Sequence, residues 1–523
     1  MFDLGRTLEA AAARAPRATA IVDTAVRWSY ADLHDRARSL VGGLDRLGLA
    51  HGDRILIILQ NRAEFALLHW ATQLAGVIAV PINWRANADE VSFFFGNARA
   101  KAIFYESVSA PAVAMSQIPE TIPRIAVGGV SGSSIIFEDL MHRLAPSDLP
   151  RASADDISLM LYTSGTTGRG KGVPRRHRAE RAAAVAHVAQ NGYTFGEITL
   201  GVMPLYHTMG VRSLLSMSLI NGTFVCLPRF DAAKALALIA SERISNLYLV
   251  PTLFHDLLAH KDFASTDTTS VKKLGFAGAA MTEGLLQRLD RAFAPELFVN
   301  HYGSSEIYTF TIEQSAAAKP SSAGKAGINT EVRVIRIGST DSTDRAATGE
   351  EGQIIATLAG DEAFEGYWQR PDADAIAICN GWYFTGDIGY YDNDGDLFVT
   401  GRVDDMIITG GENVLPAEIE SVLSLHPAVD EVAVAGISDE RLGHLVTAYI
   451  KCSRRVAKDE LDAWCKQSQL ANFKRPRTYI FVKEIPKSPV GKVLRRKLVA
   501  GDYVTETDPG SDTNTGPETQ TES

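Results

Sequence analysis

A short loop near residue 165 carries the residue types that bind a polyphosphate. Residues 163–172 read TSGTTGRGKG and directly follow the apolar run LMLY at 159–162. These ten residues include four hydroxyl side chains, four glycines and two cations. Glycines let backbone N–H groups approach an anion, hydroxyls donate hydrogen bonds to its oxygens, and cations offset its charge. Because a plain surface loop rarely has this composition straight after a buried strand, the segment predicts a nucleotide-phosphate site.

Two kinds of phosphate loop fit this segment. Gly165 to Lys171 spells GxxxxGK, which is nearly the P-loop of nucleoside triphosphatases. The next residue is Gly172, however, where a P-loop needs a hydroxyl for Mg²⁺, and Pro174 disrupts the helix that should follow. The run YTSGTTGRGKG more closely resembles the phosphate loop of the acyl-adenylate-forming superfamily, with Gly170 in place of the usual proline. That superfamily includes acyl- and aryl-CoA ligases, carrier-protein adenylation domains and luciferases.

Further segments resemble the same superfamily, in the same order. The run PLYHTMG contains the histidine that gates the acyl pocket, so the resemblance implies this role for His207. The run NHYGSSE resembles the motif YGxTE, which implies that Tyr302 stacks near adenine and that Glu306 holds Mg²⁺. Asp387 of the TGD run matches the ribose ligand, and Lys492 of PKSPVGK matches the catalytic lysine. These roles are physically sensible, because the charge of ATP must be neutralised before a carboxylate can approach its α-phosphorus.

The resemblance assigns residues to each step of the reaction. The catalytic residues are expected to be Lys492, His207 and Glu306. ATP and AMP are expected to contact Thr163, Ser164, Gly165, Thr166, Thr167, Gly168, Lys171, Gly278, Ala279, Tyr302, Gly303, Ser305, Asp387 and Arg402. Coenzyme A is expected to contact Gly410, Gly411, Phe473, Lys474, Arg475 and Arg477. Asp404 matches the hinge, and Leu442 stands in the segment where aryl-CoA ligases place an aromatic near the CoA adenine.

The acyl pocket is expected to be mostly apolar, because it must hold an uncharged acyl body. Its expected lining is Met203, His207, Met209, Tyr248, Phe276, Ala280 and Tyr308. Arg212 is unusual, since it stands in the otherwise apolar helix after His207. We expect it to point outward, because charged side chains are rarely buried without a partner. The alternative is that it recognises a polar group on the substrate.

The order of elements predicts an α/β protein. A helix at 30–47 with Ser29 as its N-cap, a strand at 54–61 and a helix at 64–76 begin a βαβ pattern typical of a parallel sheet. Past residue 330, short strands separated by Gly and Asp turns indicate antiparallel structure. The resemblance implies a large N-terminal domain of αβαβα layers with a distorted β-barrel, followed by a small mobile α+β lid. The expected domains are 1–403 for AMP and acyl binding, 404–500 for the lid, and 501–523 for a disordered acidic tail.

Composition excludes several classes of protein. The formal net charge of -10 argues against nucleic-acid binding, although six of the carboxylates lie in residues 501–523. The four cysteines form no CxxC pair, so neither a zinc site nor a disulfide framework is indicated. The N-terminus lacks the apolar core of a signal peptide, and no apolar stretch is long enough for a membrane span. We therefore expect a cytoplasmic protein, and the sequence leaves its oligomeric state open, a homodimer included.

The resemblance implies a two-step ligase that uses ATP, Mg²⁺ and coenzyme A. A carboxylic acid attacks ATP to give an acyl-AMP and pyrophosphate, and after the lid turns, CoA displaces AMP. The runs PLYH, GRVDDMIITGGEN, FKRPR and GKVLRRKL resemble benzoate- and 4-halobenzoate-type CoA ligases, which favours an aromatic acid and a role in aromatic acid catabolism. The alternatives are a medium-chain or alicyclic acyl-CoA ligase and an adenylation enzyme that loads a carrier protein. A P-loop ATPase and a non-catalytic nucleotide-binding protein are more distant alternatives.

Overall fold

The computed structural model describes residues 2–24, 26–130, 135–141, 146–163, 170–410, 412–468, 470–487 and 493–506. The chain forms two compact units: Met1–Thr385 with Tyr390–Phe398, and Gly386–Gly389 with Val399–Ser523. Within the described ranges, no helix has the length and apolar character needed to cross a membrane. Most of the expected tail falls outside these ranges. Seven expected site residues also fall outside them, namely Ser164, Gly165, Thr166, Thr167, Gly168, Gly411 and Lys492.

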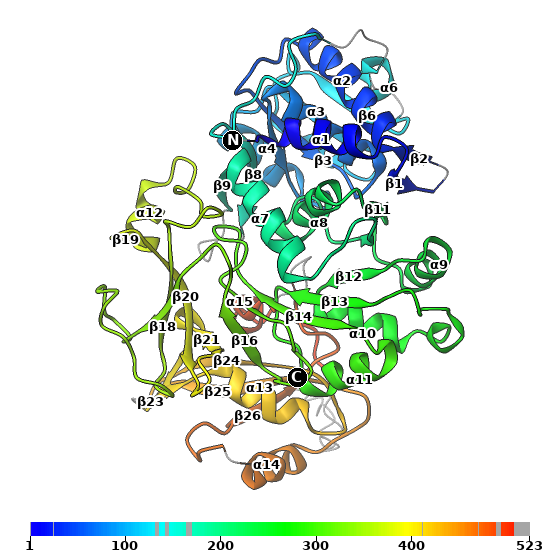
Figure 1. The fold of residues 1–523 in the computed structure, drawn as a ribbon. Helices are drawn as coiled ribbons and strands as arrows, with labels where there is room; N and C mark the ends of the chain where they lie inside the picture. Colours follow the sequence, from blue (N-terminus) through cyan, green and yellow to red (C-terminus); the bar gives the residue numbers. More distant parts are fainter. Residues whose placement is uncertain are drawn as a thin grey trace, which may run out of the picture. The chain divides into compact units, whose positions relative to one another are not determined.

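The first sheet of the larger unit is parallel except at one edge (Figure 1). Its strands, in spatial order, are β7 (Ile135–Ile136), β6 (Arg124–Val127), β5 (Ala102–Glu106), β3 (Arg54–Ile58), β4 (Ile78–Pro81), β8 (Ile157–Thr163) and β9 (Lys171–Arg176). Its helices are α1 (Leu4–Arg14), α2 (Tyr30–Arg46), α3 (Ala63–Ala75), α4 (Ala88–Ala98), α5 (Ala110–Met115) and α6 (Phe137–Leu140). Ser29 and Asp32 form a capping box at the start of α2, so the expected N-cap is confirmed.

Helices cover both faces of this sheet, as the alternation of side chains in β3 requires. Ile55 and Ile57 share a buried cluster with α1, α2 and α3. Leu56 and Ile58 belong to a separate cluster with Val91 of α4 and others. The fully buried run of this strand therefore follows from a sheet packed between two helical layers.

The second sheet changes from parallel to antiparallel at β14. Its strands, in spatial order, are β2 (Val26–Ser29), β1 (Thr19–Asp23), β11 (Thr223–Cys226), β10 (Ile198–Gly201), β12 (Asn246–Leu249), β13 (Lys273–Ala277), β14 (Leu297–Tyr302), β15 (Thr311–Glu313), β16 (Ser322–Ala326), β21 (Leu397–Arg402), β20 (Trp382–Tyr391), β18 (Gly352–Thr357) and β17 (Val332–Ile335); β19 (Ile378–Cys379) pairs with β20. The predicted antiparallel structure beyond residue 330 is confirmed by the pairing of β17 with β18 and of β16 with β21.

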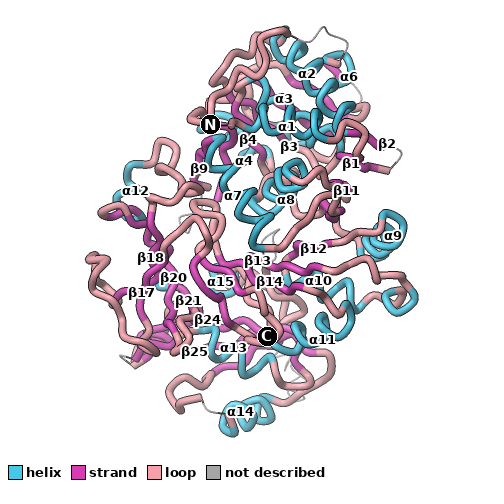
Figure 2. Tube along the Cα trace, in the orientation of Figure 1, coloured by secondary structure: helices cyan, strands magenta, loops and turns pink. Residues whose placement is uncertain are grey.

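Helices on two sides of the second sheet complete the layers. They are α7 (His177–Gln190), α8 (Thr208–Leu219), α9 (Ala232–Glu242), α10 (Pro251–Ala259), the 3₁₀ turn η1 (Phe263–Ser265), α11 (Glu283–Phe293) and α12 (Pro371–Ala377). Helices α7 and α8 lie side by side and share the cluster that contains α1 to α3 (Figure 2). Helices α9, α10 and α11 belong to a different cluster, which covers the other face of β12 and β13. The order helix, sheet, helix, sheet, helix is the predicted layering.

The smaller unit contains a sheet of its own. Its elements are η2 (Val403–Asp405), β22 (Ile407–Thr409), β23 (Glu412–Val414), α13 (Pro416–Ser424), β24 (Val429–Asp439), β25 (Gly443–Cys452), α14 (Lys458–Gln467), β26 (Thr478–Phe481) and α15 (Arg495–Val499). The strands lie in the order β23-β22-β25-β24, with β26 parallel to β25. Thr505 pairs with Val482, and the ring of Tyr503 lies 5.2 Å from that of Tyr449. The folded part therefore extends past residue 500, where the tail was expected to begin.

Candidate active site

Several predicted nucleotide and acyl residues of the larger unit lie at one edge of the second sheet. Strands β10, β12, β13 and β14 are parallel, so their carboxyl ends lie at the same edge. Met203 and His207 follow β10, Gly278 follows β13, and Tyr302 ends β14. In open α/β sheets, ligands bind outside the carboxyl ends of the strands. The fold thus brings together residues that are separated by about a hundred positions in the chain.

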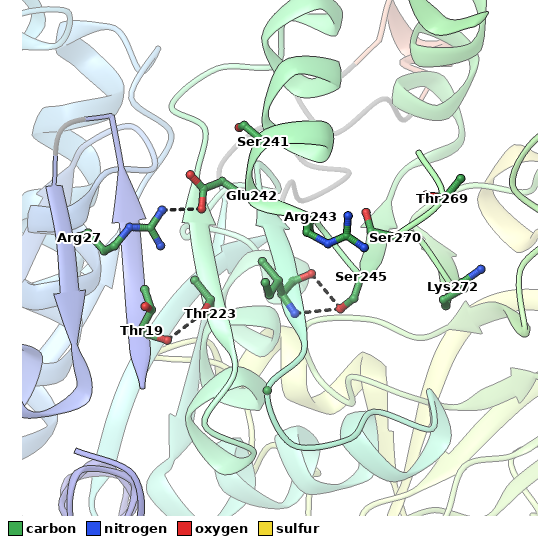
Figure 3. A pocket seen from close by; sticks show the side chains of 12 residues that line it. Thr19, Arg27, Thr223, Ser241, Glu242, Arg243, Ser245, Thr269, Ser270 and Lys272 are labelled. Carbon is green, nitrogen blue, oxygen red and sulfur yellow. Dashed lines mark hydrogen bonds and ion pairs between the residues drawn. The ribbon is translucent and has the colours of Figure 1, made fainter. Parts of the chain in front are cut away.

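A polar pocket of about 560 Å³ lies at the opposite edge of this sheet (Figure 3). Thr19, Ile198 and Thr223 begin their strands there, and Ser245 and Lys272 directly precede β12 and β13. All five residues therefore stand at the amino ends of parallel strands. This pocket contains none of the residues that the sequence predicted for the active site.

Glu306 is held in a rigid turn after β14. The hydroxyl of Ser304 accepts the backbone N–H groups of Glu306 at 3.2 Å and of Ile307 at 3.4 Å. Arg175 Nη1 and the backbone N–H of Phe364 each donate to the carbonyl oxygen of Glu306 at 2.9 Å. The turn also depends on Gly303, because a Cβ there would lie 2.1 Å from the carbonyl oxygen of Tyr308. The backbone of Glu306 is therefore fixed from both sides.

The side chain of Glu306 is linked to the base of the phosphate loop. The hydroxyl of Tyr367 donates to Glu306 Oε1 at 2.6 Å. Lys171 Nζ lies 4.2 Å from the centre of the Tyr367 ring, over its face. Lys171 pairs with Thr163 across the β8–β9 hairpin, so both residues stand where the phosphate loop begins and ends. The tyrosine joins a cation and a carboxylate that the sequence assigned to the same nucleotide.

Glu306 suits a magnesium ion that is bound to nucleotide phosphates. Its side chain is 5% exposed, and Oε2 receives no hydrogen bond from the described residues. Mg²⁺ on a nucleotide is usually held by one or two carboxylates, with phosphate oxygens and water filling the other positions. Lys319 already pairs with the three carboxylates of the Asp392, Asp394 and Asp396 cluster, which therefore does not resemble an open metal site.

His207 caps helix α8. Its Nδ1 accepts the backbone N–H of Met209 at 3.4 Å. Burial, with Arg212 as a second cause, lowers the pKa of His207 to about 4. The imidazole is therefore neutral near pH 7, which suits a gate or a hydrogen-bonding group better than a titrating acid or base.

Asn61 holds the segment that carries His207, and the sequence did not single it out. Its Nδ2 donates to the carbonyl oxygens of Gly201 at 2.9 Å and Met203 at 2.7 Å. Its Oδ1 accepts the backbone N–H of Leu205 at 2.9 Å. The feature of the sequence that could have indicated Asn61 is its position as a polar residue shortly after the buried strand β3.

Replacing Asn61 with alanine is expected to lower the free energy of unfolding by about 3 kcal/mol, because three buried backbone groups lose their partner. The same change is expected to raise KM for the acid, since the segment from Met203 to His207 is no longer fixed. Urea unfolding and steady-state kinetics measure the two effects. An unchanged midpoint together with an unchanged KM would contradict this role.

Arg212 is buried, so the expectation that it points outward is wrong. Its exposed fraction is 2%. Nη1 donates to Thr309 Oγ1 at 2.7 Å and to the carbonyl oxygen of Tyr308 at 3.3 Å, and Nη2 donates to the hydroxyl of Tyr248. Aromatic and hydroxyl groups from β12 and the segment after β14 thus replace solvent around the guanidinium. A hydropathy pattern could not show these partners, because they are distant in sequence.

The other predicted acyl residues divide between the two faces of the sheet. Met203, Met209, Tyr248 and Tyr308 are all buried. Tyr248 stands opposite Gly275 across β12 and β13, and a Cβ at Gly275 would lie 3.0 Å from its ring. Phe276 is the next residue, so its side chain lies on the other face, where its ring centre is 5.9 Å from that of Phe298. Ala280 is exposed in the turn after β13.

A second buried carboxyl belongs to the surroundings of Arg212. Glu362 is 1% exposed, and neither of its oxygens completes a hydrogen bond, although the backbone N–H of Thr309 faces it. Burial raises the pKa of Glu362 to about 7, while Arg212 and Arg175 oppose the shift. Glu180, which pairs with Arg175 at 2.8 Å, adds to it. No sequence motif pointed to Glu362.

Replacing Glu362 with glutamine is expected to stabilise the protein above pH 7. Between pH 4.5 and 7 the unfolded carboxyl is ionised while the folded one still holds its proton, so wild-type stability falls as pH rises through this window. The loss amounts to the order of 3 kcal/mol above pH 7, and glutamine, which does not ionise, avoids it. Urea unfolding at pH 5 and pH 8 tests this. Equal pH dependence in both proteins would contradict it.

In the smaller unit, Asp387 and Arg402 are brought together. Arg402 Nη1 lies 3.2 Å from Asp387 Oδ1. Gly386 has a φ of +77°, and a Cβ there would lie 2.9 Å from Arg402 Nη2. The glycine of the TGD run is therefore required by its backbone conformation and by the approach of the guanidinium.

The expected CoA residues of the smaller unit are partly engaged with one another. Lys474 pairs with Glu418 at 2.6 Å, and Arg475, which is 8% exposed, pairs with Asp462 at 2.7 Å. Arg477 and Phe473 are exposed. Gly410 has a φ of +59° and donates its backbone N–H to the carbonyl oxygen of Leu442 at 2.8 Å. Among the described residues expected to contact CoA, Arg477 is the exposed cation and is therefore best placed to meet a phosphate.

The described residues on either side of positions 488–492 contact one another. Lys487 pairs with Val493, and the backbone N–H of Leu494 donates to the carbonyl oxygen of Pro486 at 2.8 Å. Arg495 donates to Asp405, to Glu420 and to the carbonyl oxygen of Val434, which ties α15 to the rest of the unit. Asp404, the expected hinge, lies within η2.

The layered fold and the turn after β14 that holds Glu306 are those of an adenylate-forming enzyme, with a large N-terminal α/β part and a small C-terminal part. The AMP-binding enzyme family model matches residues 8–368, and the model of the AMP-binding enzyme C-terminal domain matches residues 418–492. The chain therefore belongs to the AMP-binding enzyme family. The predicted fold class and the prediction of an AMP-forming enzyme are confirmed.

Three similar proteins illustrate the range of the family. The chain is 32% identical over 504 residues to long-chain-fatty-acid–CoA ligase FadD13 of Mycobacterium tuberculosis, covering 95% of this chain and 98% of that protein. It is 34% identical over 493 residues to 4-chlorobenzoate–CoA ligase of Arthrobacter sp., covering 93% and 92%. The structure of o-succinylbenzoate coenzyme A synthetase from Bacillus subtilis with ATP and magnesium ion gives a TM-score of 0.82 at 28% identity, covering 94% and 98%.

Proposed function

We propose that this enzyme activates an aromatic carboxylic acid with MgATP and transfers the acyl group to coenzyme A. Its class, an AMP-forming acid–CoA ligase, is that of the two relatives named above, which it matches over nearly their whole length. The observation that carries the proposal is the contact chain from Lys171 through Tyr367 to Glu306, which connects the phosphate loop to a buried carboxylate. This arrangement suits the phosphates of ATP and their magnesium ion.

The first half-reaction forms an acyl-AMP. Glu306 would hold the magnesium ion, which offsets the charge of the phosphates while the acid's carboxylate attacks the α-phosphorus and pyrophosphate leaves. Lys492 would stabilise the charge that develops on the α-phosphate, and Asp387 would accept the ribose hydroxyls. In the second half-reaction, the CoA thiol attacks the acyl carbon and AMP leaves. Arg477 and Gly410 are the described residues that we assign to CoA.

An aromatic acid is favoured over a long aliphatic acid by the position of Arg212. A long alkyl chain would have to pass a buried guanidinium, and contact with it would leave polar groups without partners. A compact ring does not need to pass it. The alternative substrates are medium-chain and alicyclic acids, and the alternative acceptor is a carrier protein.

The products of the reaction test the proposal. Purified protein is incubated with MgATP and each of a panel of acids: benzoate, 4-substituted benzoates, cinnamate, cyclohexanecarboxylate, hexanoate and octanoate. AMP and pyrophosphate are expected in equal amounts, and continued turnover is expected to require free CoA. ADP and phosphate would indicate an ATPase instead. Accumulation of acyl-AMP that CoA does not discharge would favour loading of a carrier protein.

A further inference from the structure

Arg212 stands one helical turn beyond the entrance to the predicted acyl pocket. His207 caps α8, Met209 lies in its first turn, and Arg212 follows on the same face. A rise of 1.5 Å per residue places Arg212 about 7 Å further along the helix than His207. This span is comparable with the length of a benzoate from its carboxyl group to its para substituent.

The guanidinium lies between two aromatic residues assigned to the pocket. Its central carbon is 5.3 Å from the ring centre of Tyr248 and 5.8 Å from that of Tyr308. Both rings are buried, as is Thr309, whose hydroxyl oxygen accepts a hydrogen bond from Nη1. An acyl group that reaches these two rings would therefore meet Arg212.

Arg212 has hydrogen-bonding capacity that the protein does not use. A guanidinium has five N–H groups, and the described contacts account for three acceptors: Thr309 Oγ1, the carbonyl oxygen of Tyr308 and the hydroxyl of Tyr248. Nε is buried without an acceptor. Among the described residues, no carboxylate forms an ion pair with this side chain. A buried donor without an acceptor costs about 1–3 kcal/mol, so an oxygen brought by a ligand would be stabilised here.

Above pH 7, where Glu362 is ionised, the charge of this region is balanced by the protein's own carboxyl groups. Arg175 and Glu180 form a fully buried pair at 2.8 Å. Glu362 is buried close to Arg212, without completing a hydrogen bond. Two arginines thus face two carboxyl groups, and a second carboxylate on the substrate would bring a buried negative charge with no counter-charge. An uncharged oxygen avoids this cost.

We propose that Arg212 selects acids that carry an uncharged, hydrogen-bond-accepting oxygen at the end of the acyl group remote from the reacting carboxylate. This inference rests on the proposed acid–CoA ligase function. Ether, ketone and phenol oxygens qualify. A methylene or methyl group of the same shape offers Arg212 no acceptor, and a carboxylate adds charge.

Matched pairs of acids test the inference on the wild-type enzyme at pH 8, with pyrophosphate release as the readout. 4-Methoxybenzoate is compared with 4-ethylbenzoate, 4-hydroxybenzoate with 4-methylbenzoate, and 5-oxohexanoate with hexanoate. In the pair that the enzyme uses best, kcat/KM is expected to be about 10- to 100-fold higher for the oxygen-bearing acid than for its partner. Terephthalate, with a second carboxylate, is expected to be a poor substrate.

Two variants assign the preference to the guanidinium. Arg212→Met is expected to bring the ratio within each pair close to one, whereas a merely structural loss would lower both members equally. Tyr248→Phe, which removes one anchor of Arg212, is expected to reduce the ratio several-fold. Tyr30→Phe is the matched control, because it removes another buried tyrosine hydroxyl, which donates to the carbonyl oxygens of Met217 at 2.9 Å and Gly222 at 2.7 Å. That change is expected to leave the ratio unchanged.

The outcomes separate this inference from the proposed function. A wild-type ratio near one in every pair, a preference for terephthalate, or a ratio that survives Arg212→Met would each overturn the role of Arg212 while leaving the ligase intact. If Arg212→Met does not fold, the kcat/KM ratios of the wild-type enzyme and of Tyr248→Phe still test the role of Arg212. Failure of every acid to release pyrophosphate would instead overturn the ligase proposal itself.

Discussion

Replacing Glu306 with glutamine is expected to lower kcat/KM for adenylate formation by about 10²- to 10³-fold. The amide keeps an oxygen that can accept the hydrogen bond from Tyr367, so the turn after β14 should remain in place. The substitution removes the negative charge of the carboxylate that we expect to bind Mg²⁺. The ion must be held against phosphates whose charge otherwise repels the incoming carboxylate. The effect should therefore fall on the chemical step and on the magnesium requirement together.

Acid-dependent exchange of pyrophosphate with ATP, titrated with Mg²⁺, measures this effect. The variant is expected to need a higher Mg²⁺ concentration as well as to exchange more slowly. Glu365→Gln is the matched control, because Glu365 is an exposed carboxylate that pairs with Arg176 and Arg178. Wild-type exchange in Glu306→Gln, or slow exchange with an unchanged Mg²⁺ dependence, would remove Glu306 from the metal site.

The parts of the site that the sequence predicted are those whose chemistry is local. His207, Tyr302 and Glu306 stand in short runs that end a strand, and each turn depends on a nearby glycine. The placement of Asp387 beside Arg402 follows the same principle, since Gly386 leaves room for the guanidinium. Residue type, spacing and turn chemistry can be read from consecutive residues, so a short sequence motif is enough to predict them.

The parts that the sequence did not predict depend on contacts between distant segments. Asn61 fixes the His207 segment from 140 residues away, and Tyr367 reaches Glu306 from a segment without a recognised motif. Arg212 was expected to point outward because its partners, Tyr248 and Thr309, come from other elements. General rules on burial apply to an average arginine, and they fail where tertiary structure supplies acceptors.

The lysine and arginine residues between 466 and 500 show a related limit, because their ion pairs also depend on distant segments. The resemblance implies that Lys474, Arg475 and Arg477 contact CoA, but Lys474 and Arg475 each have a carboxylate partner in the folded unit. Arg495 is similarly committed to Glu420 and Asp405. Net charge in a segment therefore overstates the number of cations that a ligand can reach, because partners such as Glu418 and Asp462 lie elsewhere in the chain.

Replacing Lys492 with alanine is expected to slow acyl-AMP formation by about 10²- to 10³-fold while leaving ATP affinity within a few-fold. We expect the ammonium group to stabilise negative charge that develops on the α-phosphate. This charge is larger in the transition state than in bound ATP. A group that binds the transition state more strongly than the ground state lowers kcat when it is removed, with little change in binding.

The second half-reaction makes this prediction specific. Synthetic acyl-AMP supplied with CoA bypasses the step assigned to Lys492, so the variant should convert it to acyl-CoA at close to the wild-type rate. Lys497→Ala is the matched control, since Lys497 lies on α15 in the same segment and pairs with Asp502 at 2.8 Å. That variant should keep both half-reactions. Equal losses in both half-reactions of Lys492→Ala would point to a structural defect, and normal adenylation would remove Lys492 from the mechanism, because a lysine that only binds nucleotide has no reason to distinguish the two steps.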